Sequence, residues 1–372
     1  MRVLHLAFED HLRPGSGGGS LRNREVNSRL AALGHQIEVI AANYPGACSR
    51  TEDGVSYRHF GLPYGYAPSL LSHQLCLPAI VHAVVRRRHP DVVVEEFAPL
   101  TSSLGVGHWT RTPTVGVAQG FFAEEKARQY GLPPRLLLGV QSWGTRSHRH
   151  LVAVSEDVRR QLLSVAPRAE VAVVANGVDC AAAEAARRSA PPRTGSQMLF
   201  LGRFEVHQKG LDVLIEAVRQ VSAGVRLLLA GDGKDRERVR GLVQTAGVED
   251  RVELVGPVRG EAKWRLIAQS DLLVQPSRYE TFGISVLEAM ACGTPVVTSD
   301  LPCLRELLPP AAGVRVPAGD PGALAEAINA VMASPDRRSS MEQAGPTLAG
   351  RYDWDAIARA QAAVYARAVE EV

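Results

Sequence analysis

Short apolar runs alternate with helical segments along the whole chain, and this alternation constrains the fold more than any other feature. Residues 2–8 form an apolar run. A helical segment follows at 21–33, with Ser20 as its predicted cap and Gly34 at its end, and residues 36–42 form the next run. A strand, a helix and a second strand in this order make a βαβ unit, which requires a parallel sheet. Because the runs are almost continuously apolar, we predict strands that helices cover on both faces, as in a doubly wound α/β fold.

The alternation occurs in two series, and the chain length of 372 residues also suggests two domains. Residues 181–195 show no apolar alternation, and Pro191-Pro192 cannot continue a helix, so we place a linker at 186–195. The predicted domains are residues 1–185 and 196–352, and we expect the last helix, 353–372, to return to the first domain. Ligands of such sheets bind at the carboxyl ends of the strands, so two Rossmann-like domains that face each other would hold a ligand in a cleft.

Charge, cysteine content and hydropathy exclude several classes of protein. Forty-two basic and 39 acidic residues give a net charge of +3 with no uniformly basic stretch, so we expect no nucleic-acid partner. The five cysteines include no Cys-x-x-Cys pair, which argues against a disulfide framework and for a cytoplasmic location. Residues 70–85 are the most apolar stretch, and we predict a buried helix there. The arginines at 86–88 allow contact with anionic lipid, but a solvated helix end is the preferred interpretation.

Lysine is rare in this chain. Most of its cations are arginine, which, with the Ala, Gly and Pro content, is typical of a GC-rich bacterial genome. The four lysines are Lys126, Lys209, Lys234 and Lys263. Each therefore marks a position where a compact point charge stands in place of the usual forked guanidinium.

Two loops of the second series carry a pattern suited to a nucleotide sugar. Arg203 and Lys209 follow one strand and can converge on a diphosphate. Residues 282–284 (Phe282, Gly283, Ile284) start a helix, where free backbone N–H groups favour phosphate. Glu288, on that helix, suits the two hydroxyls of a ribose, and Glu280 suits the hydroxyls of a second sugar. Either carboxylate would otherwise be an ordinary helix-start or surface residue.

The run from Pro276 to Val297 resembles the retaining glycosyltransferases of the GT-B fold known as family 4. The shared features are a Glu, seven residues and a second Glu (Glu280 and Glu288), with an Arg-x5-Lys upstream (Arg203 and Lys209). The resemblance extends from about residue 151 to the C-terminus, whereas the first half matches only in pattern. It implies an α/β GT-B fold and a sugar transfer from a UDP- or GDP-type donor without cofactor or essential metal.

The resemblance also implies roles for individual residues. Arg203 and Lys209 would neutralise the leaving diphosphate, Glu280 would contact the donor sugar, and Glu288 the ribose. Gly18 and Gly19 would bring backbone N–H groups close to phosphates and acceptor, although this glycine loop is also compatible with a flexible linker. Arg259 and its neighbours would face the base.

Gln119 stands where this family commonly has a His, after the strand 114–118. A Gln amide can orient a sugar hydroxyl, but it does not titrate near neutral pH. The acceptor stays open: a small molecule, a glycan or a lipid-linked molecule, in a bacterial natural-product or cell-envelope pathway. The alternative function is that of a nucleotide-sugar epimerase or hydrolase, or of a non-catalytic nucleotide-sugar-binding subunit.

Overall fold

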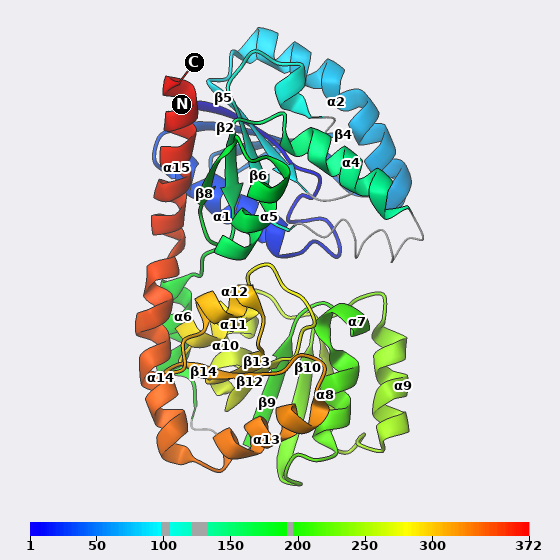
Figure 1. The fold of residues 1–372 in the computed structure, drawn as a ribbon, viewed down its shortest axis with the longest axis vertical. Coiled ribbons are helices and arrows are strands. Elements are labelled where there is room, and N and C mark those ends of the chain that lie inside the picture. Colours follow the sequence, from blue (N-terminus) through cyan, green and yellow to red (C-terminus); the bar gives the residue numbers. More distant parts are fainter. Residues whose placement is uncertain (98–104, 121–132, 192–195, 372) are drawn as a thin grey trace. The chain divides into compact units, whose positions relative to one another are not determined.

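A computed structural model describes residues 1–97, 105–120, 133–191 and 196–371. The chain divides into two compact units, each built around its own sheet (Figure 1). The first unit is Met1–Asn176 together with Trp354–Val372, and the second is Gly177–Asp353. The C-terminal helix therefore belongs to the first unit.

The first unit contains an eight-stranded sheet of order β3-β4-β2-β1-β5-β6-β7-β8. All its strand pairs are parallel except β3–β4. Its strands are β1 (Arg2–Leu6), β2 (Gln36–Ala42), β3 (Arg50–Glu52), β4 (Val55–Phe60), β5 (Val92–Phe97), β6 (Thr114–Ala118), β7 (His150–Ala153) and β8 (Glu170–Val173). Its helices are α1 (Gly18–Ala32), α2 (Tyr66–Arg88), the 3-10 turn η1 (Val106–His108), α4 (Pro134–Thr145), α5 (Glu156–Val165) and α15 (Trp354–Glu370).

Alternate residues of these strands face two different hydrophobic clusters, as the two-residue period of a strand requires. Val3 belongs to the cluster that α1 and α15 cover, and it packs there with Trp354. Leu4 belongs to the other cluster, together with Leu77 and Val81 of α2. Burial on both faces is why the strands of the sequence read as continuous apolar runs.

Helix α1 begins earlier than the sequence suggests. Gly18 and Gly19 form its first turn, and Ser20 does not cap it, because the Ser20 hydroxyl donates to the carbonyl of Gly17 at 2.7 Å. The predicted start at Leu21 is therefore wrong. A helix that starts directly in the glycine run brings these glycines into a fixed position at the end of β1.

Helix α2 is only partly buried, so the prediction of a buried helix is wrong. Leu71 and Leu75 are 61% and 78% exposed, whereas Leu77 and Val81 pack against the sheet. Within the described residues, the segment Pro68–Arg88 is the one helix long and apolar enough to cross a membrane, with a mean hydropathy of 1.3. The helix thus has one face in the core and an apolar face outside it.

The second unit contains a six-stranded, fully parallel sheet of order β11-β10-β9-β12-β13-β14. Its strands are β9 (Ser196–Leu201), β10 (Val225–Ala230), β11 (Val252–Gly256), β12 (Leu272–Gln275), β13 (Val296–Ser299) and β14 (Gly313–Val316). Its helices are α6 (Cys180–Ser189), α7 (Val206–Lys209), α8 (Leu211–Val218), α9 (Arg236–Ala246), α10 (Gly260–Gln269), α11 (Ile284–Ala291), α12 (Pro302–Leu307), α13 (Pro321–Met332), α14 (Pro335–Ala349) and the 3-10 turn η2 (Gly350–Tyr352).

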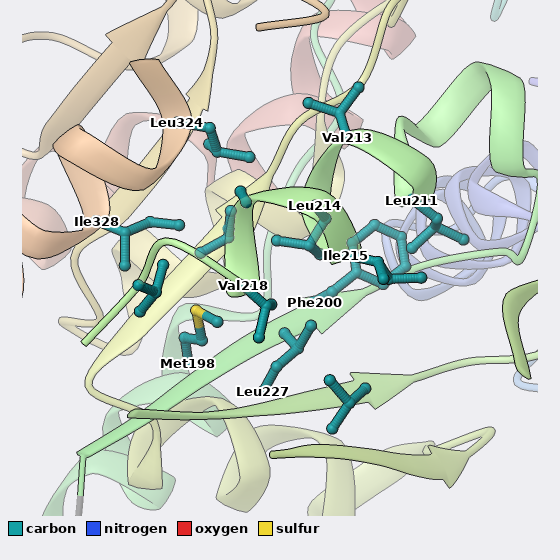
Figure 2. Close-up of a cluster of buried hydrophobic side chains, with 14 of the residues drawn as sticks. Met198, Phe200, Leu211, Val213, Leu214, Ile215, Val218, Leu227, Leu324 and Ile328 are labelled. Carbon is teal, nitrogen blue, oxygen red and sulfur yellow. The ribbon is translucent and has the colours of Figure 1, made fainter. Parts of the chain in front are cut away.

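One core of this unit lies between the sheet and the helices α8 and α13, as Figure 2 shows. Phe200 and Leu227 of the sheet meet Leu214 and Val218 of α8 and Ile328 of α13 there. All five side chains are at least 99% buried. This packing fixes the strands whose carboxyl ends carry the predicted phosphate-binding residues.

The predicted linker is partly helical. Helix α6 covers Cys180–Ser189 and packs against α10 and α11, so residues 186–189 belong to the second unit. The Asp179 side chain caps this helix by accepting from the backbone N–H of Ala182 at 2.8 Å, and the alanines that follow are strong helix formers. The boundary between the units lies at Asn176–Gly177, before this helix. Apolar alternation was therefore the wrong criterion for a helix made mainly of alanine.

Candidate active site

The predicted donor residues gather at one edge of the second sheet. The chain runs outward from β9 to β11 and then returns to place β12 beside β9, so the strand order reverses between these two strands. Arg203 follows β9, and Glu280 follows β12. In open parallel sheets this reversal point, at the carboxyl ends of the strands, is where ligands bind.

Lys209 and Glu280 form an ion pair at this edge. Lys209 Nζ lies 2.5 Å from Glu280 Oε1, and the two side chains are only 13% and 10% exposed. The same carboxylate oxygen accepts from Ser277 Oγ at 2.9 Å and from Gln275 Nε2 at 3.2 Å. Three donors on one oxygen hold the Glu280 side chain in a fixed position.

Arg278 connects the loop that contains Glu280 to the helices α7 and α8, which follow β9. Its guanidinium donates two bonds of 2.8 Å to the carboxylate of Asp212 and one of 3.0 Å to the carbonyl of His207. Its own backbone N–H donates to the carbonyl of Gln208 at 2.9 Å. Bidentate pairs of this kind are geometrically specific, so the two loops are held as one element.

Arg203 is the more exposed cation of the predicted pair. Its side chain is 51% exposed, and Nη1 lies 3.8 Å from Glu205 Oε1, which is beyond hydrogen-bond distance. The structure therefore places Arg203 at the same strand edge as Lys209, with a guanidinium that can still turn toward an anion.

The start of α11 offers backbone donors beside this pair. Gly283 precedes the helix with φ 96°, and a Cβ at this position would lie 2.7 Å from Leu304 Cδ2, so only glycine fits. Gly283 is the N-cap residue, so within the described part of the chain the helix start has no side-chain cap from its own N-cap position. Phe282 is buried and packs edge-on against Tyr352, which leaves the backbone of Phe282, Gly283 and Ile284 for an anion.

Glu288 pairs with a lysine that the sequence motif does not contain. Lys263 Nζ of α10 donates to Glu288 Oε1 at 2.5 Å, and it lies 4.2 Å from the ring centroid of Trp264. Glu288 is 6% exposed, and burial together with the Glu288 charge raises the pKa of the neighbouring Cys292 thiol to about 12. Arg259, at the start of α10 and one turn before Lys263, is exposed.

The predicted residues of the first unit meet at the carboxyl ends of β5 and β6. A Cβ on Gly19 would lie 3.6 Å from Gln119 Cγ and 3.2 Å from Glu96 Oε1. Gly18 is the first residue of α1, directly before this contact. The structure thus brings Gly18, Gly19 and Gln119 together, and it adds Glu96.

Sequence reasoning missed five residues of these two sites: Lys263, Gln275, Ser277, Arg278 and Glu96. Only two of them carried a signal. Lys263 is one of four lysines in the chain. Glu96 is the second of two glutamates that directly follow three valines. Gln275, Ser277 and Arg278 act through contacts that a linear pattern does not reveal.

One group of possible metal ligands occurs among the described residues. His150, Glu170 and Glu371 lie close together, but Arg367 is 2.7 Å from Glu170 and Arg149 is 2.8 Å from Glu371. His150 and Glu170 begin β7 and β8, so the group lies at the amino edge of the first sheet, away from the strand ends that carry Gln119. Arginines neutralise these carboxylates, and we interpret the group as a surface ion-pair network.

Two family models match the chain. The model described as Glycosyltransferase Family 4 matches residues 16–182, and the model described as Glycosyl transferases group 1 matches residues 182–347. A phosphatidyl-myo-inositol mannosyltransferase of Mycobacterium leprae is 36% identical over 363 residues, which is 94% of this chain and 92% of that protein. A glycogen synthase of Mycobacterium tuberculosis is 30% identical, over 98% of this chain and 94% of that protein.

Solved structures share the fold. A sucrose-phosphate synthase from Thermosynechococcus elongatus superimposes with a TM-score of 0.87 at 22% identity, with both chains fully covered. Anabaena HepE, solved in complex with UDP and glucose, gives a TM-score of 0.78 at 20% identity over 99% of this chain and all of the other. With its two Rossmann-like α/β units, the chain belongs to the GT-B glycosyltransferases of the group 1 and family 4 type.

Proposed function

We propose that this glycosyltransferase moves a sugar from a nucleoside-diphosphate donor, of the UDP or GDP type, to a hydroxyl-bearing acceptor with retention of configuration and without an essential metal. The Lys209–Glu280 pair carries the proposal, because it puts a fixed cation and a fixed carboxylate side by side at the switch point of the second sheet. A sugar donor fits this arrangement, because its diphosphate would bind the cation Lys209 and its sugar hydroxyls would bind the carboxylate of Glu280.

Lys209 can serve both parts of the donor at once. An ammonium group has three N–H donors, and the contact with Glu280 uses one of them. The other two remain for oxygens of the diphosphate, to which Arg203 and the free backbone N–H groups at the start of α11 would also donate. These groups would stabilise the negative charge that grows on the diphosphate as the bond to the sugar breaks.

Glu280 and Glu288 would bind two different sugars of the donor, the transferred sugar and the ribose. Glu280, held in place by Ser277 and Gln275, would accept hydrogen bonds from hydroxyls of the transferred sugar. Glu288 would accept from the ribose hydroxyls, and Lys263 is the ion-pair partner of this buried side chain. Arg259 and the start of α10 would lie toward the base. Gln119 would orient a sugar hydroxyl from the first unit.

The relatives suggest the type of acceptor. Their names include an inositol lipid and polysaccharide products, and Anabaena HepE was solved with UDP. We therefore propose a polyol or a glycan, free or linked to lipid, in a bacterial biosynthetic pathway. A cytoplasmic location fits the five cysteines, none of which forms a disulfide.

A donor-consumption assay separates transfer from the alternatives. The protein is incubated with UDP-glucose or GDP-mannose, with and without a set of polyol acceptors, and products are resolved by mass and anomeric configuration. The proposal requires a retained glycoside that forms only when an acceptor is present. An isomerised donor would instead indicate an epimerase, a free sugar a hydrolase, and tight binding without turnover a non-catalytic subunit.

A further inference from the structure

The proposed function leaves one carboxyl group at a ligand-binding edge without a role. In the first sheet the strand order reverses between β1 and β5. Glu96 is the next-to-last residue of β5, and it therefore lies at the switch point, where α1 follows β1. This is the same position in the first sheet that the donor residues occupy in the second.

The neighbours of Glu96 form a small polar site. Asn23 Nδ2 of α1 donates to Glu96 Oε2 at 2.5 Å. Gly19 lies so close that a Cβ there would be 3.2 Å from Glu96 Oε1 and 3.6 Å from Gln119 Cγ. A side chain at position 19 would press on both groups, so glycine keeps this edge of the sheet open beside the carboxylate.

The charges around Glu96 do not neutralise it by direct contact. Among the described residues, no cationic nitrogen lies within 4.0 Å of its carboxylate. Arg22 of α1 faces it from a greater distance, and the Arg22 guanidinium is held by the carbonyl of Val174 at 3.0 Å and by Gln361 at 2.9 Å. Glu9, after β1, adds a second negative charge, and Tyr365 of α15 is close enough to interact electrostatically with Glu96.

This environment keeps the carboxyl group near its titration point. Burial, with the help of the Glu9 charge, raises the pKa of Glu96 to about 7, although hydrogen bonds from Asn23 and Gln119 and the charge of Arg22 act in the opposite direction. Glu96 is partly buried and, among the described residues, has no ion pair; a carboxyl group in such a place costs stability, and such costs concentrate at functional sites. Packing alone would not favour a Glu over an apolar residue at the end of β5.

We propose that Glu96 binds the acceptor: its carboxylate accepts a hydrogen bond from a hydroxyl group of a neutral polyol or sugar, with the amide of Asn23 beside it. The inference rests on the proposed transferase function and names the substrate class of its first domain. Glu96 is thus a substrate-binding residue rather than a structural one.

Asn23 supports a ligand over a purely structural role. It is 6% exposed, and its Oδ1 has no hydrogen-bond partner among the described residues. If Asn23 served only to hold the structure together, we would expect hydrogen-bond partners for both its Nδ2 and its Oδ1, as buried amides usually have. The two carboxylates, Glu9 and Glu96, also disfavour an anionic group at this spot, so a hydroxyl of an uncharged part of the acceptor fits best.

The test compares the wild type with Glu96→Gln, which keeps the shape and removes the charge. Glu156→Gln, a surface carboxylate of α5 that pairs with Arg159, is the matched control. Transfer from UDP-glucose and GDP-mannose to myo-inositol and glucose is measured from pH 5.5 to 8.5. Calorimetry with UDP and GDP gives the nucleotide affinity of each variant independently of the acceptor.

We expect wild-type kcat/KM for the acceptor to rise through a single step near pH 7. Glu96→Gln should lose this step and raise the acceptor KM about ten- to hundredfold at pH 8, the range for a lost hydrogen bond to a charged group. Its nucleotide affinity should stay unchanged, as in Glu156→Gln.

Three results would count against these claims. An unchanged acceptor KM and pH step in Glu96→Gln would overturn the role of Glu96. A wild type that binds nucleotide but transfers to neither polyol would overturn the acceptor class. A wild type that binds neither nucleotide would overturn the proposed function itself.

Discussion

Lys209 Nζ and Glu280 Oε1 lie 2.5 Å apart although 71 residues separate them in the chain. The pair joins the loop region after β9 to the loop after β12, and Arg278 locks the same two segments through Asp212. The charges of Lys209 and Glu280 are therefore in place before any ligand arrives. Preorganised charges of this kind are the largest single contribution to many enzymatic rates.

Replacing Lys209 should abolish most of the turnover. We expect Lys209→Ala to lower kcat by about two to three orders of magnitude, the loss that follows removal of one preorganised donor. Arg219→Ala, which removes a surface cation paired with Glu216 on α8, serves as the control. Steady-state transfer rates at saturating donor decide the matter, and a near-normal rate for Lys209→Ala would exclude the diphosphate role.

Replacing Glu280 and replacing Glu288 should weaken the binding of different parts of the donor. Glu288→Ala should weaken the binding of free nucleoside diphosphate, because we assign it to the ribose. Lys263→Ala should weaken it as well, because it leaves Glu288 buried without its partner. Glu280→Ala should spare the free nucleotide and weaken the complete sugar donor.

Calorimetric titration of these three variants with UDP or GDP, and then with the matching nucleotide sugar, separates the roles. Equal losses of free-nucleotide affinity in Glu280→Ala and Glu288→Ala would contradict the division. A Lys263→Ala variant that binds nucleotide as tightly as the wild type would show that Glu288 does not depend on its lysine.

Asp10 should govern the acid stability of the first unit. Its carboxylate accepts from Arg50 at 2.7 and 2.9 Å and is contacted by His59 at 2.8 Å. Burial opposes its ionisation, but hydrogen bonds from Arg50, His11 and His59 outweigh it and hold the pKa of Asp10 well below its usual range.

A depressed carboxyl pKa stabilises the fold above the ordinary value near 4 and loses that effect as the pH falls further. We expect Asp10→Asn to cost about 3–5 kcal/mol at pH 7, since it leaves Arg50 without its buried partner. The cost should shrink below pH 4. Urea unfolding from pH 3 to 7 measures this, and parallel stability curves for the two proteins would contradict the assignment.

Glu96 should show the opposite pH dependence. Its raised pKa means that the folded state holds a proton that the unfolded state releases, so the wild type loses stability from about pH 4.5 to about 7 and then levels off. Glu96→Gln should remove this loss and be more stable than the wild type at pH 8, by about 1–3 kcal/mol. Thermal unfolding across pH 5 to 8 gives the comparison. A constant difference between the two proteins over this range would show that Glu96 does not titrate there.

The sequence predicted the second domain better than the first. The strand ends that carry Arg203 and Glu280 and the start of α11 at Ile284 follow from local patterns: an apolar run, a glycine and an amphipathic helix. The Lys263–Glu288 pair does not, because it depends on how α10 packs beside α11. The same holds for Glu96, whose significance comes from Gly19 and Asn23 on a helix distant in sequence.

Predictions from local sequence were also wrong where one residue type occurs in two kinds of structure. The glycines before Ser20 read as a loop, yet their backbone continues directly into α1. The stretch 180–189 read as a linker because it lacks large apolar residues, yet alanine needs none to form a helix. In α2, apolar residues read as core, although Leu71 and Leu75 are exposed.

The central claim is that the second domain binds a nucleoside diphosphate through Arg203, Lys209 and the start of α11. Calorimetric titration of the wild type, Lys209→Ala and Arg219→Ala with UDP and with GDP, without added metal and with a chelator present, tests it most directly. We expect one of the two nucleotides to bind the wild type and Arg219→Ala equally. Lys209→Ala should bind it at least about tenfold more weakly, because it loses a charge-assisted hydrogen bond. Equal affinity in all three proteins, or binding that appears only when a divalent metal is added, would contradict it.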